Sequence, residues 1–411
     1  MEPIYSVMDS DKDRKNKRKI YLDTNLQLVF GITLVQIMGI SIITPAFPKL
    51  VKYFNISAED IGLLITFFTL PGILLAPILG FIADRWGRKK IIIPALMLFG
   101  IAGGACFFVR DFETLLILRL FQGIGAAPIG ILGTTIIGDL YYKKELVVAM
   151  GYNSTVRNIG SASYPTIGGA LTLIGWHYPF ILPVIAIPVG FLVLFFLNNP
   201  ESRHNHQNIK DHLYNVWNSI RNLKVIGFLI LGTTTFIILF GSYMTFFPFL
   251  MENFFEASPL IIGIIMSIMS FTAALTSSQL GKMISLYPKK ILLLIAFSFY
   301  TLALIIIPFV PKLWQLLIPI IILGIAHGIN IPVIHTIISE MAHQEYRATF
   351  FSISGMFFRL GQTIGPILMG LFFSFWGIKA PFYFGAVLAL IMIITINFIY
   401  RYSLAFERKR D

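Results

Sequence analysis

Three arginines lie within long stretches of apolar and small residues, where a charged side chain is rare. They are Arg119, Arg157 and Arg359. An arginine inside a membrane-spanning helix costs at least ~2.5 kcal/mol, so each of them needs a partner or access to water. A guanidinium group binds carboxylates and phosphates through paired hydrogen bonds. The three arginines therefore indicate either an anion-binding cavity or cross-links to backbone carbonyls inside a bundle of helices.

Uncharged polar side chains recur at helical spacing beside these arginines. Asn153, Ser161 and Tyr164 share a helical face with Arg157, and Gln362 lies on the same face as Arg359. We take such residues, with a few from other runs, as candidates for substrate contact or coupling. The candidates are Asp23, Gln36, Arg119, Gln122, Asn153, Arg157, Tyr164, Tyr243, His327, Arg359 and Gln362.

No acidic residue lies in the middle of an apolar run, since all 20 occur in loops or at helix ends. An exporter of cations needs a buried carboxylate that binds either the cation or a proton. Asp23, at the edge of the first run, is either a helix cap or a proton carrier. A proton could instead be carried by His327 or His335, because the pKa of histidine is near neutral; both could also be structural.

Aromatic side chains form a stripe along one run, at Phe236, Phe240, Tyr243 and Phe247. Such a stripe could line a pocket for a flat hydrophobic compound. It could equally face lipid or a neighbouring helix. Tyr243 is the strongest candidate for a pocket, because its hydroxyl group requires a polar partner.

The composition requires that these residues be held in a membrane. The chain has 411 residues, of which 56% are hydrophobic and only 13% are charged, whereas soluble domains contain about 25% charged residues. The single cysteine and the scattered histidines exclude a disulfide and a metal signature, and we expect no cofactor and no enzymatic activity. Twelve apolar runs are long enough to be spanning helices. They lie at 25–48, 58–82, 91–109, 114–138, 146–174, 178–197, 225–250, 259–285, 290–309, 314–339, 347–375 and 380–400.

The positive charge is distributed unequally between the two sides of this predicted bundle. Of the 32 Lys and Arg residues, 24 fall on the side of the chain termini, five on the other side and three within runs. Such a bias places both termini in the cytoplasm of a cell-membrane protein. The net charge of +12 is thus explained by membrane topology, and nucleic acid is not an expected partner.

The chain divides into two halves around a polar segment at 198–224. Its apolar residues recur on one helical face, which predicts an amphipathic helix, either at the inner membrane surface or as a soluble linker. The expected organisation is a cytoplasmic leader, a six-helix bundle, this linker, a second six-helix bundle and a cytoplasmic tail. Their respective ranges are 1–24, 25–197, 198–224, 225–400 and 401–411.

An internal repeat supports this division. Sliding the chain by 201 residues places Gly62 on Gly263 and Pro165 on Pro366 without any gap. Apolar bias alone does not align glycine and proline. Two parallel repeats of six helices, with a central site between them, are an architecture of secondary transporters. The predicted fold is therefore all-α, with twelve transmembrane helices in two pseudo-symmetric bundles.

The segment after the second run carries a recognisable motif, Gly80-Phe-Ile-Ala-Asp84-Arg85-Trp86-Gly87-Arg88. It resembles the signature of the major facilitator superfamily. The resemblance implies that these residues form a conformational latch, in which Asp84 contacts the start of span 11 and holds the outward-facing state. We define the latch as Gly80, Asp84, Arg85, Gly87 and Arg88.

The fifth run carries a second motif, which is similar to the antiporter signature of that superfamily. Its residues are Gly151, Gly160, Pro165, Gly168 and Gly169, and Tyr164 replaces one further glycine of the signature. Small residues let helix backbones approach closely. The resemblance implies a sealed contact between spans 5 and 8, and it also implies export in exchange for protons.

Together the motifs resemble the twelve-helix drug:proton antiporters. The resemblance also links Arg119 to proton coupling. We expect a secondary-active exporter of small amphipathic or acidic compounds, coupled to protons, working by alternating access in the lipid bilayer as a monomer. The alternatives are an organic-anion, siderophore or lipid transporter of the same fold, or a membrane sensor that no longer transports. Three arginines without a buried acid argue against a simple pump for cationic drugs.

Overall fold

The computed structural model describes residues 20–198, 223–341 and 347–407, and every regular element in these ranges is helical. Ten of its helical segments are long and apolar enough to cross a membrane. The two other predicted spans are also helical. In one of them the apolar stretch among the described residues is Asp60–Leu75, and the other carries polar residues along its length. Within the described residues, ten of the twelve predicted crossings therefore meet the criteria of length and hydropathy.

The described residues of the first half form seven α-helices and five short 3₁₀ segments. The α-helices are α2 (Thr24–Ser41), α3 (Phe47–Phe54), α4 (Leu63–Trp86), α5 (Arg88–Ala105), α6 (Phe112–Leu140), α7 (Lys143–Ile174) and α8 (Ala186–Phe196). The 3₁₀ segments are η1 (Ile20–Leu22), η2 (Thr44–Ala46), η3 (Asp60–Gly62), η4 (Cys106–Phe108) and η5 (Tyr178–Ile185).

In the second half, the part of the chain that the structure describes forms eight α-helices, one π-helix and two short 3₁₀ segments. The α-helices are α10 (Leu223–Ile237), α11 (Phe247–Phe255), α12 (Pro259–Ser278), α13 (Leu280–Leu286), α14 (Lys289–Ile306), α15 (Leu317–Met341), α16 (Arg347–Trp376) and α17 (Ala380–Glu407). The other segments are the π-helix η6 (Ile238–Phe246) and the 3₁₀ segments η7 (Ile307–Phe309) and η8 (Leu313–Leu316).

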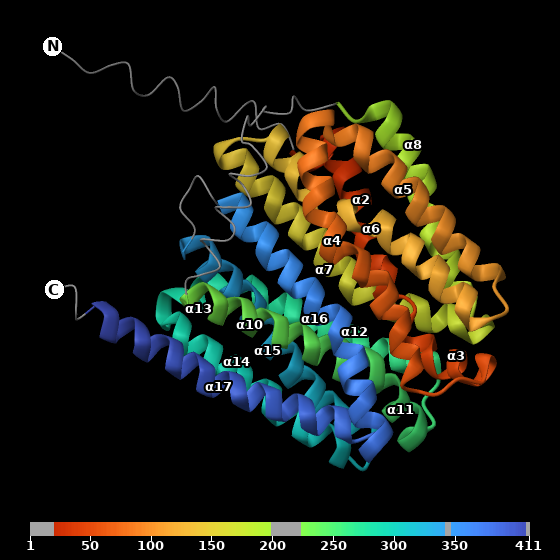
Figure 1. The fold of residues 1–411 in the computed structure, drawn as a ribbon, viewed down its shortest axis with the longest axis vertical. Helices are drawn as coiled ribbons and strands as arrows, with labels where there is room; N and C mark the ends of the chain where they lie inside the picture. The colour runs from red at the N-terminus through yellow and green to blue at the C-terminus, as the bar shows by residue number, and fades with distance from the viewer. Residues whose placement is uncertain (1–19, 199–222, 342–346, 408–411) are drawn as a thin grey trace.

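The helices of each half pack mainly against one another, as the separate groups in Figure 1 show. The beginning of α2 and the end of α17 lie on one side of the molecule, and α3 and α11 lie on the other. We call these the terminal side and the distal side. Contact between the halves runs mainly along two helix pairs, α4 with α16 and α7 with α12, and α3 also contacts α11.

The first and seventh spans extend further than the sequence predicts. The first was expected to end at residue 48, but proline at the start of α3 is compatible with a new helical turn, and the helix continues to Phe54. It ends where Asn55 adopts φ 51°, and the seventh span ends likewise at Glu256, with φ 49°. Positions 55 and 256 are repeat equivalents, so the two copies share the same left-handed helix ending.

The seventh span contains a π-helix that the sequence did not predict. In η6 the side chain of Thr245 donates to the Phe240 carbonyl at 2.7 Å, five residues earlier. Gly241 lies here because a Cβ at this position would be 2.6 Å from the carbonyl oxygen of Gly365 in α16. Wider helical turns of this kind often occur at functional positions.

Local signals in the sequence account for several other helix boundaries. Gly87 adopts φ 98° between α4 and α5, a conformation that favours glycine. Asp111 caps α6 by accepting a hydrogen bond from the backbone amide of Thr114 at 2.8 Å. That bond holds the pKa of the Asp111 carboxyl below its usual range.

The 201-residue repeat is visible in equivalent ion pairs. Arg88 at the start of α5 pairs with Asp139 near the end of α6 at 3.1 Å. The equivalent Lys289 at the start of α14 pairs with Glu340 near the end of α15. Both pairs therefore join corresponding helix ends on the terminal side of each half.

Several predicted features lie outside the described residues. They include the leader up to residue 19, the amphipathic segment at 199–222 and the last four residues of the tail. The side chain of Asp84 and the residues that precede α16 are outside them as well.

Close packing inside each half predicts a sharp difference between two glycines of α6. A Cβ on Gly123 would lie 2.2 Å from the carbonyl oxygen of Phe68 in α4, whereas a Cβ on Gly138 would meet nothing within 4 Å. We expect Gly123→Ala to destabilise the protein by roughly 1–3 kcal/mol, since neither backbone can move away at low cost. Thermal unfolding in detergent should show a midpoint several degrees lower for Gly123→Ala and an unchanged midpoint for Gly138→Ala. Equal midpoints would contradict the packing described here.

Candidate functional site

The two halves meet through a pair of symmetric close contacts. A Cβ on Gly62 at the start of α4 would lie 2.8 Å from Pro366 of α16. Its repeat equivalent, Gly263 of α12, would place a Cβ 2.2 Å from the carbonyl oxygen of Pro165 in α7. Each glycine of one half therefore packs against the equivalent proline of the other. We call the α4–α16 contact the first seam and the α7–α12 contact the second seam.

Hydrogen bonds reinforce both seams at equivalent positions. Thr66 donates to the carbonyl of Thr363 at 2.9 Å across the first seam. Ser267, the repeat equivalent of Thr66, shares a 2.7 Å hydrogen bond with Thr166 across the second seam. Thr69 adds a bond of 2.8 Å to the side chain of Thr363. Because most of these groups are buried, separating the halves here exposes polar groups that must find other partners.

The antiporter-like motif is only partly within the second seam. A Cβ on Gly169 would lie 2.2 Å from the carbonyl oxygen of Pro259 in the other half, and one on Gly168 would lie 1.8 Å from that of Ile42 in its own half. Gly160 faces Leu34 of α2. A Cβ on Gly151 would meet nothing within 4 Å among the described residues, so its predicted packing role stays a prediction.

An ion pair lies beyond the seams on the distal side. Lys52 of α3 binds Glu252 of α11 at 2.7 Å and so joins the two halves. Toward the terminal side, a Cβ on Gly138, Gly281 or Gly355 would meet nothing within 4 Å. The halves are therefore joined at the distal side by the two seams and by this ion pair.

Arg119 is an internal cross-link of the first half. Its guanidinium donates to the carbonyls of Gly39 at 2.8 Å and Leu64 at 3.2 Å, and to the side chain of Gln122 at 2.6 Å. It also lies over the ring of Phe68 at 4.3 Å, and only 1% of it is exposed. Arg119 and Gln122 thus hold α2, α4 and α6 together, and in this conformation they are sealed off from any substrate.

Two more polar candidates are also bound within the first half. Asn153 accepts a hydrogen bond from Thr33 at 2.7 Å, and Tyr164 donates to the carbonyl of Leu34 at 3.1 Å. Both bonds join α7 to α2. By joining α7 to α2, these two residues fix the position of the helix that carries Arg157.

Arg157 and Arg359 differ from Arg119 in that neither guanidinium makes a hydrogen bond or ion pair with any residue the structure describes. Both side chains are half-buried near the middle of α7 and α16. Arg157 lies close enough to His335 of α15 to act on its charge. Arg359 reaches across to the first half, where it lies near Gln36. The structure thus brings two unpaired positive charges into the region between the halves.

The remaining candidates lie in the interior of the second half or at its surface. The ring nitrogen Nδ1 of His327 is 2.9 Å from the hydroxyl of Tyr300. Tyr243 is 2% exposed and donates to the carbonyl of Met266 at 3.5 Å. Gln362 is half-buried on α16.

The aromatic stripe is packed into the bundle. Phe240, Tyr243 and Phe247 are buried, and Phe236 packs against Phe358 with ring centroids 5.1 Å apart. The pocket proposed from sequence is therefore absent from the described part of the second half, since α10, η6 and α16 fill it with their own side chains.

Asp23 is the N-cap of α2, where it accepts a hydrogen bond from the backbone amide of Asn25 at 2.9 Å. Of the latch, Gly87 forms the turn before α5, Arg85 is exposed and Arg88 pairs with Asp139. The contact proposed between Asp84 and the start of span 11 lies outside the described residues.

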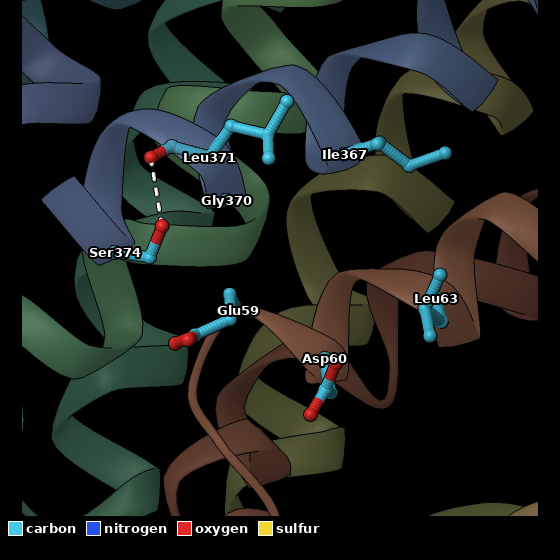
Figure 2. Close-up of a pocket in the computed structure, with 7 residues that line it drawn as sticks. All are labelled: Glu59, Asp60, Leu63, Ile367, Gly370, Leu371 and Ser374. Atoms are coloured by element: carbon cyan, nitrogen blue, oxygen red, sulfur yellow. Dashed lines mark hydrogen bonds between the residues drawn. The ribbon is translucent and has the colours of Figure 1, made fainter.

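A small cavity of about 160 Å³ lies at the distal end of the first seam (Figure 2). Glu59 and Asp60 line one wall, and the other is formed by the α16 stretch from Ile367 to Ser374. Its charged groups are both acidic, and the carboxylate of Asp60 accepts a hydrogen bond from Ser57. This cavity is therefore a feature of the closed distal side and does not suit an anion.

Comparison with known proteins agrees with this architecture. The family model described as Major Facilitator Superfamily matches residues 29–255 and 229–411. The chain belongs to the major facilitator superfamily. Within it, the chain is 25% identical over 387 residues to Multidrug resistance protein 1 of Bacillus subtilis (strain 168), a match that covers 93% of this chain and 97% of that protein. It is 29% identical over 163 residues to the Bacillibactin exporter of the same organism, which covers 38% of this chain and 40% of that one.

The crystal structure of the nucleoside transporter NupG has the same fold as this major facilitator protein. The two chains superpose with a TM-score of 0.76 at 16% identity, over 92% of this chain and 99% of NupG. The superfamily recognised from the motifs and the all-helical membrane fold are both confirmed, and the protein is a secondary transporter.

Several residues of the site were not found from the sequence. The Thr66–Thr363 and Thr166–Ser267 bonds and the Lys52–Glu252 pair all join the two halves. The repeat contained a signal for the two hydroxyl contacts, because positions 66 and 267 are equivalent. The sequence does not show that these residues contact the opposite half rather than their own.

Charge reversal at the distal pair tests whether it holds the halves together. Lys52 and Glu252 are 71% and 24% exposed, and such a pair contributes about 0–1 kcal/mol. We expect Lys52→Glu to open the distal side more often, raising the maleimide labelling rate of a Thr69→Cys reporter by up to about fivefold. The exchanged pair, Lys52→Glu with Glu252→Lys, should restore the slow rate. Identical rates in all three backgrounds would contradict a distal closure by this pair.

Proposed function

We propose that this transporter is a proton-coupled exporter of small amphipathic compounds that carry an acidic group. The observation that supports this most is the pair of half-buried arginines, Arg157 and Arg359, with no partner among the described residues. A charge in such surroundings is stabilised when an opposite charge binds. An anionic substrate would supply that charge and would be held by two guanidinium groups from opposite halves.

The distribution of acidic residues supports the same substrate class. None of the 20 lies in the middle of a predicted span, and Asp23 caps a helix. A cation would therefore meet two positive charges in the middle of the spans, where the sequence places no carboxylate. This charge pattern disfavours a permanent cation as the main substrate.

We further propose that both termini lie in the cytoplasm of a cell-membrane protein and that the protein works as a monomer. The 24 Lys and Arg residues on the terminal side against five on the distal side support this orientation. We keep the two bundles at 25–197 and 225–400, the linker between them and the latch around Asp84 as parts of this proposal.

A siderophore exporter is the second candidate. It is favoured by the similarity to the Bacillibactin exporter, which extends over 38% of this chain. Export of a large iron-binding compound also requires a wide opening between the halves. Transport assays with compounds of increasing size would distinguish the two candidate functions.

His335 is our proposed proton carrier. It lies within electrostatic reach of Arg157, whereas His327 is joined to Tyr300 inside the second half. The charge on His335 is thus coupled to the region in which the substrate would bind.

Replacing the two arginines tests the substrate class. We expect Arg157→Gln and Arg359→Gln each to raise the KM for 2-naphthoate in proteoliposomes on the order of tenfold or more, because a hydrogen bond to a charged group contributes about 1.5–3 kcal/mol. Arg110→Gln is the matched control, since Arg110 is exposed on the distal side. Unchanged kinetics in both variants, or transport of tetraphenylphosphonium but not of 2-naphthoate, would overturn the proposal.

Proton coupling requires a separate test in which the membrane potential is clamped. An anion responds to the potential by about 2.3 kcal/mol per charge for each 100 mV, so valinomycin and equal potassium concentrations must remove it. We expect a pH gradient alone to drive accumulation of 2-naphthoate against its gradient. His335→Gln should abolish this accumulation while counterflow continues, and His327→Gln should retain it. Accumulation that is insensitive to the pH gradient in the unaltered protein would exclude proton coupling.

A further inference from the structure

Arg359 occupies a space that exists because α4 has no side chain at Gly72. A Cβ placed on Gly72 would lie 2.1 Å from the Nη1 atom of Arg359, 2.7 Å from its Cζ and 2.9 Å from its Cδ. The guanidinium therefore lies directly against the backbone of a helix from the other half. Thr363, which closes the first seam, is one helical turn further toward the distal side.

A second glycine opens the same space from α6. A Cβ on Gly130 would lie 2.6 Å from Nε2 of Gln36 and 3.1 Å from Nη2 of Arg359. The two nitrogens, one from each half of the protein, thus both lie within about 3 Å of the same point beside Gly130. Both are hydrogen-bond donors, and a carboxylate can accept from two donors at once.

Neither donor is used within the described protein. The side chains of Gln36 and Arg359 make no hydrogen bond or ion pair with a described residue. Two other glycines of α6 behave differently. Gly123 and Gly125 of α6 face backbone atoms of neighbouring helices at 2.2 Å and 2.7 Å, so they serve helix packing. Gly72 and Gly130 instead face the ends of polar side chains.

We propose that Gly72, Gly130, Gln36 and Arg359 form a carboxylate-binding subsite between the halves, an inference that rests on the proposed function. The two glycines leave a slot in which the guanidinium and the amide both reach the same carboxylate. Gln36 and Arg359 contact the substrate, while Gly72 and Gly130 are positioning residues. Binding of the carboxylate links the two halves one turn below the first seam.

The same geometry makes the two glycines testable without unfolding the protein. A methyl group at residue 72 or 130 would meet the flexible end of a side chain, which can move aside at low cost. It would displace Arg359 or Gln36 from the slot. Gly133→Ala is the matched control, because Gly133 lies in the same helix as Gly130. Its Cβ would meet Ile32 of α2 at 3.4 Å, which is an ordinary contact distance.

The experiment compares Gly72→Ala, Gly130→Ala and Gly133→Ala in proteoliposomes with 2-naphthoate and the uncharged 2-naphthamide. We expect Gly72→Ala and Gly130→Ala to raise the KM for 2-naphthoate about tenfold, the effect of losing one charged hydrogen bond. The maximal rate, the unfolding temperature without ligand and the KM for 2-naphthamide should be unchanged. The increase in unfolding temperature that 2-naphthoate produces should be reduced in the same two variants. Gly133→Ala should match the unaltered protein in every measurement.

The possible failures separate the subsite from the proposed function. If the unaltered protein transports 2-naphthoate and both glycine variants keep its KM, the subsite is wrong and the proposed function stands. If the KM rises equally for 2-naphthoate and 2-naphthamide, or if the unfolding temperature without ligand is lowered, the glycines serve only helix packing. Either result also overturns the subsite. If the unaltered protein neither binds nor transports 2-naphthoate, both proposals fail.

Discussion

The close approach of glycine to proline across the two seams is the constraint on which the rest of the structure depends. Gly62 against Pro366 and Gly263 against Pro165 bring helix backbones of opposite halves together at the distal side. Because the two contacts are related by the 201-residue repeat, the halves can rock about them as equivalent bodies. Because these glycines have no side chain, the neighbouring threonine and serine hydroxyls come close enough to form hydrogen bonds across the seams.

Closure at one side determines where charge can be placed. Arg119 is held by backbone carbonyls within one half, so its cost in the membrane is offset by the fold itself. Arg157 and Arg359 lie in the middle of α7 and α16, the helices that form the seams, and their guanidinium groups extend into the region between the halves. Neither charge has a partner among the described residues. In our account, a substrate carboxylate fills that role and couples the opening of the seams to transport.

Much of the fold follows directly from the sequence, and the site follows only in part. Apolar runs and the repeat predict the helices, because both depend on composition and spacing. The roles of the arginines do not follow, since Arg119 and Arg359 occupy similar apolar surroundings in sequence and only the packing of α2 and α4 shows which one is satisfied. The slot at Gly72 and Gly130 was likewise invisible, because a glycine that faces a distant side chain looks the same in sequence as one that faces a backbone.

The most direct test of the central claim is a structure of the protein with 6-bromo-2-naphthoate, in which anomalous scattering from bromine locates the ligand. Our account predicts one bromine peak between the halves, with the carboxylate bound by Arg359 and Gln36 next to Gly72 and Gly130. A ligand bound elsewhere, or an Arg359 guanidinium that pairs with a carboxylate of the protein itself, would contradict it.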